Sequence, residues 1–157
     1  MADWVAEGRS APVFTLPADD GTKVRLTALK GQPVVLYFYP KDDTPGCTRE
    51  ACAFRDRHQE LAQLGAIVLG VSPDGIERHG KFRDKYGLNF RLLADVDHKV
   101  AEKYGAWREK NMYGKKRMGI QRSTFLIDAR GKIATVWKRV KVDGHDEQVI
   151  AALQALE

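Results

Sequence analysis

The sequence has little cysteine and no long hydrophobic run. Its only two cysteines in 157 residues are Cys47 and Cys52. The longest apolar run, at 33–40, is far too short to cross a bilayer and predicts a buried strand. Residues 1–9 contain an early acid and no unbroken apolar stretch, so they lack the basic start and the apolar middle of a secretory signal. These absences predict a cytoplasmic protein with no membrane span.

The scarcity of cysteine also bears on how the chain is stabilised. Thiols stay reduced in such a compartment, so a catalytic or metal-binding role for the pair gains weight over a structural disulfide. With 43% hydrophobic residues and no internal repeat, the chain can bury a core without disulfides. We expect one domain over residues 1–157. The net charge of +5 favours encounters with anions but does not identify a partner.

Hydrophobic patterning predicts strands that alternate with helices. The expected strands cover 13–16, 23–26, 33–40, 66–71, 91–93, 123–127 and 133–137. The expected helices cover about 45–64, 76–86, 100–104 and 145–156. The polar, basic, glycine-punctuated stretch 107–121 is expected to be a long loop. This order predicts an α/β fold with a mixed central sheet flanked by helices, preceded by an extra N-terminal β-hairpin.

Cys47 lies at the expected start of a helix. Thr44 is an N-cap type residue and Pro45 suits the first helical position, which puts Cys47 about three residues after the cap. Unpaired N–H groups and the helix dipole favour a negative charge there, and the thiolate is the nucleophilic form of cysteine. The alternative is a plain core cysteine, because Cys47 shares an apolar helical stripe with Ala51 and Phe54.

The residues around Cys47 resemble a known active-site loop. The run from Tyr39 to Thr48 is similar to the peroxiredoxin pattern Pro-x-x-x-Thr-x-x-Cys. The stretch from Cys47 to Cys52 resembles the bacterioferritin comigratory protein, or Q-type, branch of that family. The similarity extends from 11–14 to 121–128, so it covers most of the chain. It implies a thioredoxin-like fold and a peroxidase that acts on hydrogen peroxide and organic hydroperoxides.

The resemblance also implies roles for individual residues. Cys47 would be the peroxidatic nucleophile, Thr44 would hydrogen-bond the thiolate and the peroxide, and Pro40 would shield the pocket. Arg122 matches the family arginine, whose guanidinium would hold the thiolate and polarise the peroxide oxygens. Without the resemblance, Arg122 would be interpreted as a surface arginine in a basic stretch.

Cys52 would be the resolving cysteine. The cycle implied is oxidation of Cys47 to a sulfenic acid, an intramolecular disulfide with Cys52, and reduction by thioredoxin or a similar dithiol. In an ideal helix the two Cα atoms would be about 8.7 Å apart, whereas a disulfide needs roughly 4.4 to 6.8 Å. The bridge therefore requires the first helical turns to unwind. We expect a monomer with no cofactor and no bound metal.

Three other interpretations of the sequence compete with a peroxidase function. A zinc site from Cys47, Cys52 and His58 lacks a fourth ligand with suitable spacing. A thioredoxin-like disulfide reductase should carry Cys-x-x-Cys, which this sequence does not have. A nucleic-acid-binding module is suggested by basic residues interleaved with Trp107 and Tyr113, but acids are mixed among them and no known binding motif is present. The basic residues are Arg108, Lys110, Lys115, Lys116, Arg117 and Arg122.

Overall fold

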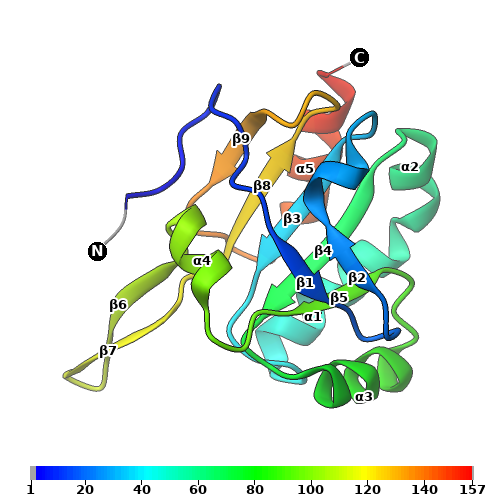
Figure 1. The fold of residues 1–157 in the computed structure, drawn as a ribbon. Helices are drawn as coiled ribbons and strands as arrows, with labels where there is room; N and C mark the ends of the chain where they lie inside the picture. Colours follow the sequence, from blue (N-terminus) through cyan, green and yellow to red (C-terminus); the bar gives the residue numbers. More distant parts are fainter. Residues whose placement is uncertain (1–2, 157) are drawn as a thin grey trace.

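A five-stranded sheet forms the centre of the molecule (Figure 1). A computed structural model describes residues 3–156 of the chain, apart from the side chain of Met112. The strand order is β5-β4-β3-β8-β9. The strands are β3 (Val34–Phe38), β4 (Ile67–Ser72), β5 (Arg91–Ala94), β8 (Ser123–Ile127) and β9 (Ile133–Trp137). Strands β3, β4 and β5 are parallel, whereas β8 and β9 run antiparallel to their neighbours. This mixed sheet confirms the predicted thioredoxin-like fold.

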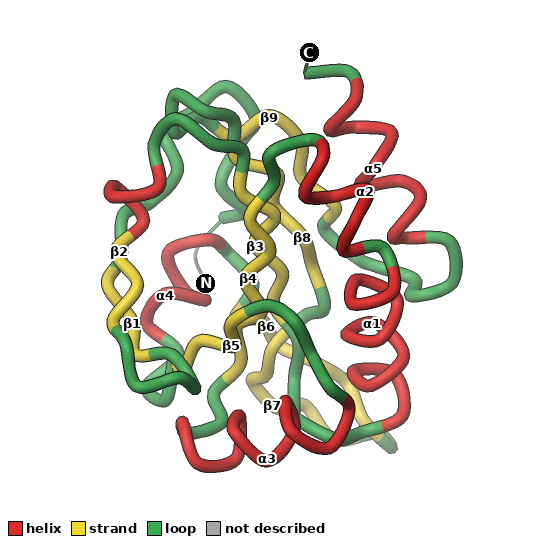
Figure 2. Tube along the Cα trace, turned by 90° about the vertical axis from the view of Figure 1, so that its right-hand side faces the viewer, coloured by secondary structure: helices red, strands yellow, loops and turns green. Residues whose placement is uncertain are grey.

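Helices and a hairpin cover the two faces of the sheet, which Figure 2 shows edge-on. One side carries α1 (Pro45–Asp56), α2 (His58–Gln63) and α5 (His145–Gln154). The other side carries the expected N-terminal hairpin, β1 (Thr15–Pro17) and β2 (Lys23–Arg25), followed by the 3-10 helix η1 (Leu26–Leu29), together with α4 (Lys99–Tyr104). Helix α3 (Ile76–Tyr86) connects β4 to β5.

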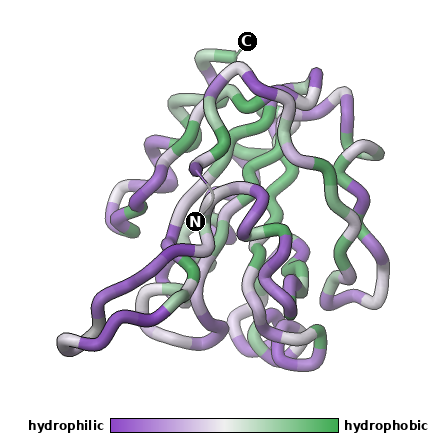
Figure 3. The backbone as a smooth tube through the Cα atoms, turned by 60° about the vertical axis from the view of Figure 1, so that its left-hand side comes forward, coloured by the Kyte–Doolittle hydropathy of each residue, from purple (hydrophilic) through white to green (hydrophobic). Residues whose placement is uncertain are grey.

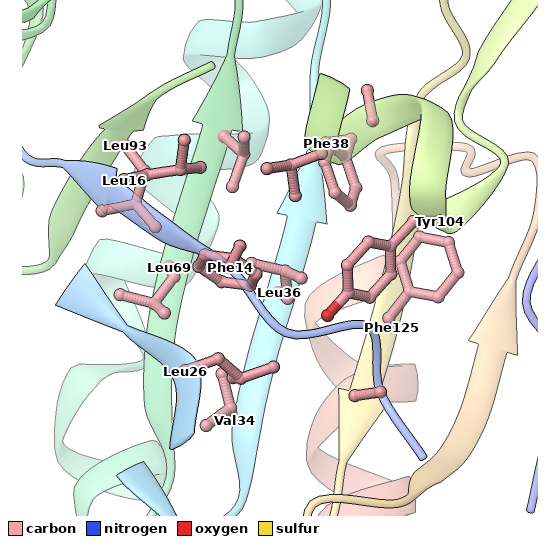
Figure 4. Close-up of a cluster of buried hydrophobic side chains, with 14 of the residues drawn as sticks. Phe14, Leu16, Leu26, Val34, Leu36, Phe38, Leu69, Leu93, Tyr104 and Phe125 are labelled. Carbon is pink, nitrogen blue, oxygen red and sulfur yellow. The ribbon is translucent and has the colours of Figure 1, made fainter. Parts of the chain in front are cut away.

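The central strand β3 divides the core into two clusters. Successive side chains of a strand point to opposite faces. Leu36 and Phe38 therefore face the N-terminal hairpin and pack with Phe14 and Leu16 (Figure 4). Tyr37 faces the opposite side and packs beneath α1. All five β3 residues are buried, as the continuous apolar run predicts for a strand covered on both faces.

The predicted single helix over 45–64 is wrong, because it is broken at Arg57. Helix α1 ends at Asp56 and α2 begins at His58. The Arg57 N–H bonds to the carbonyl of Phe54, three residues back, so the helix tightens and stops there. The Arg57 guanidinium donates to Asp146 at 3.0 Å. That partner lies on α5, 89 residues away in the sequence, and the same guanidinium donates to Glu60, three residues further along the chain, at 3.0 Å.

The stretch 107–121 is a hairpin and not the loop that composition predicts. Strands β6 (Trp107–Met112) and β7 (Lys115–Ile120) pair antiparallel and form a separate sheet. Tyr113 and Gly114 connect them, both with positive φ (54° and 79°), as two-residue hairpin turns require. The hairpin projects from the body and is polar along most of its length (Figures 1 and 3). Polar residues on both faces hide the alternation that normally identifies a strand.

Candidate active site

Cys47 occupies the predicted position at the start of α1. Thr44 is the N-cap residue and Pro45 the first helical residue, so Cys47 is the third. The helix follows β3, and its first turn contains no acidic residue to compete for the positive end of the dipole. The Cys47 side chain is buried, with 2% exposure. A backbone environment that favours a thiolate therefore surrounds a sulfur with little access to water.

Thr44 serves the loop in a way that its N-cap position does not suggest. Its side chain makes no cap hydrogen bond, and its hydroxyl donates instead to the carbonyl of Lys41 at 2.8 Å. This bond closes the loop that leads into α1. Pro40, at the end of the buried β3 segment, is half-buried beside the same loop.

Arg122 is distant from Cys47 in the sequence but contacts its sulfur in the fold. Its Nη2 donates to the Sγ of Cys47 at 3.3 Å, although the two residues are 75 positions apart. The backbone position is fixed because the Val140 N–H donates to the Arg122 carbonyl, immediately before β8. A Cβ at Gly46 would lie 3.1 Å from Nη2, so a residue without a side chain leaves room for the guanidinium. The structure thus brings the predicted pair into contact.

Glu50 is a third member of the site that the sequence analysis missed. Its Oε1 accepts a hydrogen bond from the Nη1 of Arg122 at 2.8 Å. Burial raises the pKa of Glu50 to about 7, against the opposing attraction of Arg122. Its Oε2 has no hydrogen-bond partner among the described residues. The available signal was its place three residues after Cys47, on the buried stripe of α1, where a carboxyl needs a cationic partner.

The guanidinium of Arg122 links the thiol and the carboxyl. Burial disfavours its charge, but the attraction of Glu50 and of Cys47 outweighs burial and raises the pKa of Arg122. Arg122 therefore stays charged. Whenever Glu50 takes up a proton, the sulfur of Cys47 still accepts a hydrogen bond from this charged group.

Cys52 lies further along the same helix and is half-buried. Helix α1 is continuous from Pro45 to Asp56, so ideal geometry places its Cα about 8.7 Å from that of Cys47. Both cysteines are free thiols in this state. A bond between them would require the helix to open.

A buried hydrogen-bond network, also missed in the sequence, holds the loop before Cys47. Asp42 is completely buried and accepts from the hydroxyl of Tyr39 at 2.6 Å. Its other oxygen lies 2.6 Å from the Nδ1 of His79, and the Nε2 of His79 bonds to the carbonyl of Leu93 at 2.9 Å. The Asp42 N–H donates to Asp74 at 2.8 Å. The loop is thereby tied to α3 and to the end of β5.

Within residues 3–156, Asp42, Asp74 and His79 are the one cluster with metal-ligand spacing. Their polar atoms already engage one another, a hydroxyl and the backbone. The cluster therefore fits a hydrogen-bond network better than a cation site. The zinc alternative of Cys47, Cys52 and His58 does not form a ligand group among these residues.

The fold and the geometry together define a class of protein. A thioredoxin-like sheet, a cysteine at a helix N-terminus and a guanidinium donating to its sulfur form the arrangement of a thiol-based peroxidase. Among the described residues, no helix has the length and apolar character needed to cross a membrane.

Comparisons with known proteins identify the family. The AhpC/TSA family model matches residues 8–136. A putative peroxiredoxin Bcp of Coxiella burnetii is 54% identical over 146 residues, which cover 93% of this chain and 97% of the relative. The peroxiredoxin Bcp of Bacillus subtilis is 52% identical over 150 residues, which cover 96% and 94%.

Solved structures agree with this assignment. A peroxiredoxin Q of Xanthomonas campestris superposes with a TM-score of 0.87 at 44% identity and covers 90% of each chain. A bacterioferritin comigratory protein of the same organism, studied for alkyl peroxide reduction, has a TM-score of 0.90 at 40% identity and covers 96% of this chain and 99% of that one. The chain therefore belongs to the AhpC/TSA family, in its peroxiredoxin Bcp and Q branch, and is a thiol peroxidase.

Proposed function

We propose that Cys47 is the nucleophile that attacks hydrogen peroxide and organic hydroperoxides. Its thiolate would attack one oxygen of the peroxide, so that an S–O bond forms as the O–O bond breaks. Cys47 becomes a sulfenic acid, and the other oxygen leaves as water or an alcohol after taking a proton from solvent. The observation that carries this proposal is the 3.3 Å contact between Arg122 Nη2 and the sulfur. A cation placed there stabilises the thiolate and the charge that develops on the peroxide oxygens.

Cys52 is proposed to resolve the sulfenic acid. Its thiolate attacks the sulfur of Cys47, water leaves, and an intramolecular disulfide forms. An external dithiol, thioredoxin or a protein like it, then reduces this disulfide by exchange. Thr44 is proposed to hydrogen-bond the peroxide, and Pro40 to limit the access of water to the pocket. The need for a dithiol reductant supports a cytoplasmic location, where such reductants are maintained.

A single-turnover experiment tests the two cysteine roles. Reduced protein is mixed with one equivalent of hydrogen peroxide, and the tryptophan fluorescence and intact mass are followed. Cys47→Ser should lose peroxide consumption, because a hydroxyl is not activated as a thiolate is. Cys52→Ser should retain one turnover and accumulate the sulfenic acid. Consumption at the wild-type rate by Cys47→Ser would show that another group is the nucleophile.

The disulfide is further proposed to unwind the first turns of α1, roughly residues 44–53, because the intact helix holds the two Cα atoms too far apart. Unwinding would expose Phe54 and the disulfide to the reductant. Helix α2 should remain folded, since Arg57 ties its start to Asp146 on α5. Amide exchange in reduced and oxidised protein measures this. Equal protection of 44–53 in both states, with the bridge confirmed by mass, would refute the unwinding.

We also propose that residues 1–157 act as one domain and as a monomer. Light scattering of the reduced and oxidised protein would measure the mass in solution, and a concentration-dependent dimer would contradict the proposal. A disulfide reductase remains the competing activity with the same fold. Insulin reduction measured beside peroxide consumption separates the two.

A further inference from the structure

An open hollow lies next to Arg122, outside the contacts already described. Its volume is about 390 Å³. Both sides of its wall are continuous with the backbone around Arg122, because Gln121 precedes this residue and Val140, which follows Arg139, bonds to its carbonyl. The lining residues are Arg108, Glu109, Lys110, Asn111, Gln121 and Arg139.

The hairpin that supplies most of this wall carries an unusual pairing of charge. Lys110 on β6 lies directly opposite Arg117 on β7. Residues opposite each other in an antiparallel pair share a face, and like charges in that position destabilise the sheet. Glu109 and Lys116, whose charged atoms lie 3.9 Å from each other, are adjacent in sequence to this pair and therefore belong to the other face. The hairpin itself does not neutralise the face that carries Lys110.

The base of the hairpin is fixed, so Lys110 has a defined place. Trp107 stacks on His98 with ring centroids 3.7 Å apart. The guanidinium of Arg108 lies over the ring of Trp4, 4.9 Å from its centroid. Lys110 is half-buried, and no carboxylate of the described residues lies within ion-pair distance of it. It is a cation that is partly withdrawn from water and has no anionic partner.

The electrostatics of Lys110 connect it to the reaction centre. Burial lowers the pKa of Lys110, the charge of Arg122 lowers it further, and Cys47 acts in the opposite direction. The hollow lined by Lys110 also includes Gln121, the residue before Arg122, so Lys110 lies near the guanidinium whose Nη2 contacts Cys47. An anion bound in the hollow would offset the repulsion between Lys110 and Arg122.

We propose that Lys110, assisted by the exposed Arg139, binds an anionic group of the substrate and so selects hydroperoxides that carry a carboxylate. The inference rests on the proposed role of Cys47 as the nucleophile and specifies the substrate class of that site. A small anion fits better than a polyanion, because Lys110 is half-buried and the carboxylate of Glu109 lines the same hollow. The O–O group of the substrate would lie at Cys47 while its carboxylate binds to Lys110 on the hairpin.

A matched pair of substrates tests the proposal. One is an alkyl hydroperoxide that carries a carboxylate a few bonds from the O–O group, and the other is its methyl ester. The rate constant for oxidation of reduced protein is measured by stopped-flow tryptophan fluorescence for each. We expect the carboxylate to react about tenfold faster than the ester at low salt, with the ratio approaching one as screening increases.

The carboxylate-to-ester ratio of rate constants is measured for each variant as well. A change in the general reactivity of Cys47 affects both rate constants equally and leaves this ratio unchanged. Lys110→Met should reduce the carboxylate-to-ester ratio to about one, and Arg139→Met should reduce it partly. Lys116→Met removes the same charge from the other face of the hairpin and should leave the ratio as in the wild type. A wild-type ratio of one at low salt, or a ratio unchanged in Lys110→Met, would overturn the anion site while both substrates still oxidise Cys47. Failure of both substrates to oxidise wild-type protein would overturn the role of Cys47 and this inference with it.

Discussion

Replacing Glu50 with Gln should change how the stability of the protein depends on pH. The carboxyl is 2% exposed, is bonded through one oxygen to Arg122, and has a pKa raised to about 7 by burial. Gln is nearly isosteric, can still accept from the guanidinium, and does not titrate. The substitution therefore removes the ionisation and preserves the shape of the site.

The raised pKa of Glu50 determines whether its contribution to stability rises or falls with pH. Between the ordinary value of 4.5 and about 7 the folded protein keeps the Glu50 proton that the unfolded chain has released. Stability from this group is therefore fully present below pH 4.5, declines as pH rises to about 7, and is constant above that. At 1.36 kcal/mol per pKa unit, the whole decline is at most about 3 kcal/mol. Glu50→Gln lacks the decline, so its unfolding free energy relative to wild type should rise by up to this amount between pH 4.5 and 8.

Urea unfolding of both proteins at half-unit pH steps measures the difference. Other carboxyls with shifted pKa values do not contribute to this difference, because they are the same in both proteins. Burial raises the pKa of Asp95, and a hydrogen bond from Lys85 lowers the pKa of Asp43. Asp43→Asn, at an exposed site, serves as the control and should not alter the pH dependence above 4.5. Parallel curves for wild type and Glu50→Gln across pH 4.5 to 8 would refute the reasoning.

Three further substitutions test other parts of the structure. Arg122→Met should lower the fraction of Cys47 present as thiolate and slow its reaction with peroxide about a hundredfold or more; thiolate absorbance and stopped-flow rates measure both, and no change in either would remove Arg122 from the site. His79→Leu should cost about 1–3 kcal/mol of unfolding free energy in urea, because it removes the buried hydrogen bonds from His79 to Asp42 and to the Leu93 carbonyl, and a loss under about 0.5 kcal/mol would contradict the network. Gly105→Ala should lower the thermal midpoint by several degrees, since φ is +89° and a Cβ would lie 2.5 Å from a backbone atom of Trp4; an unchanged midpoint would count against this close approach.

Local patterns predicted the main strands and helices because each buries one continuous face. The β3 run is apolar throughout, and the Thr44-Pro45 pair marks the start of α1 where the structure has it. The hairpin over 107–121 escaped detection because neither of its faces is packed into the main core along most of its length, so no alternation of apolar residues develops. At the break, the Arg57 guanidinium bonds both to Asp146 on α5, which is distant in sequence, and to Glu60 in the first turn of α2.

The site could be predicted only as far as spacing and resemblance extend. The contact between Cys47 and Arg122 joins residues 75 positions apart, and it was expected from the resemblance rather than from chemistry in the sequence. Glu50 could have been predicted as part of the site from physical chemistry alone. A carboxyl on the apolar stripe of α1 requires a buried cation, and Arg122, placed at the start of a core strand, was available to supply it.

The reaction centre combines firmly held parts with one weakly held part. The loop before Cys47 is tied down by the buried Asp42 network, and Arg122 is placed by backbone bonds at the start of β8. The first turn of α1 has no side-chain cap, no acidic residue to complement the helix dipole, and Gly46 at its second position. A helix start that leaves its N–H groups free for a thiolate gives up the bonds that would otherwise stabilise it. The features that favour the reactive form of Cys47 therefore also lower the cost of unwinding the segment that would have to open for the proposed disulfide with Cys52 to form.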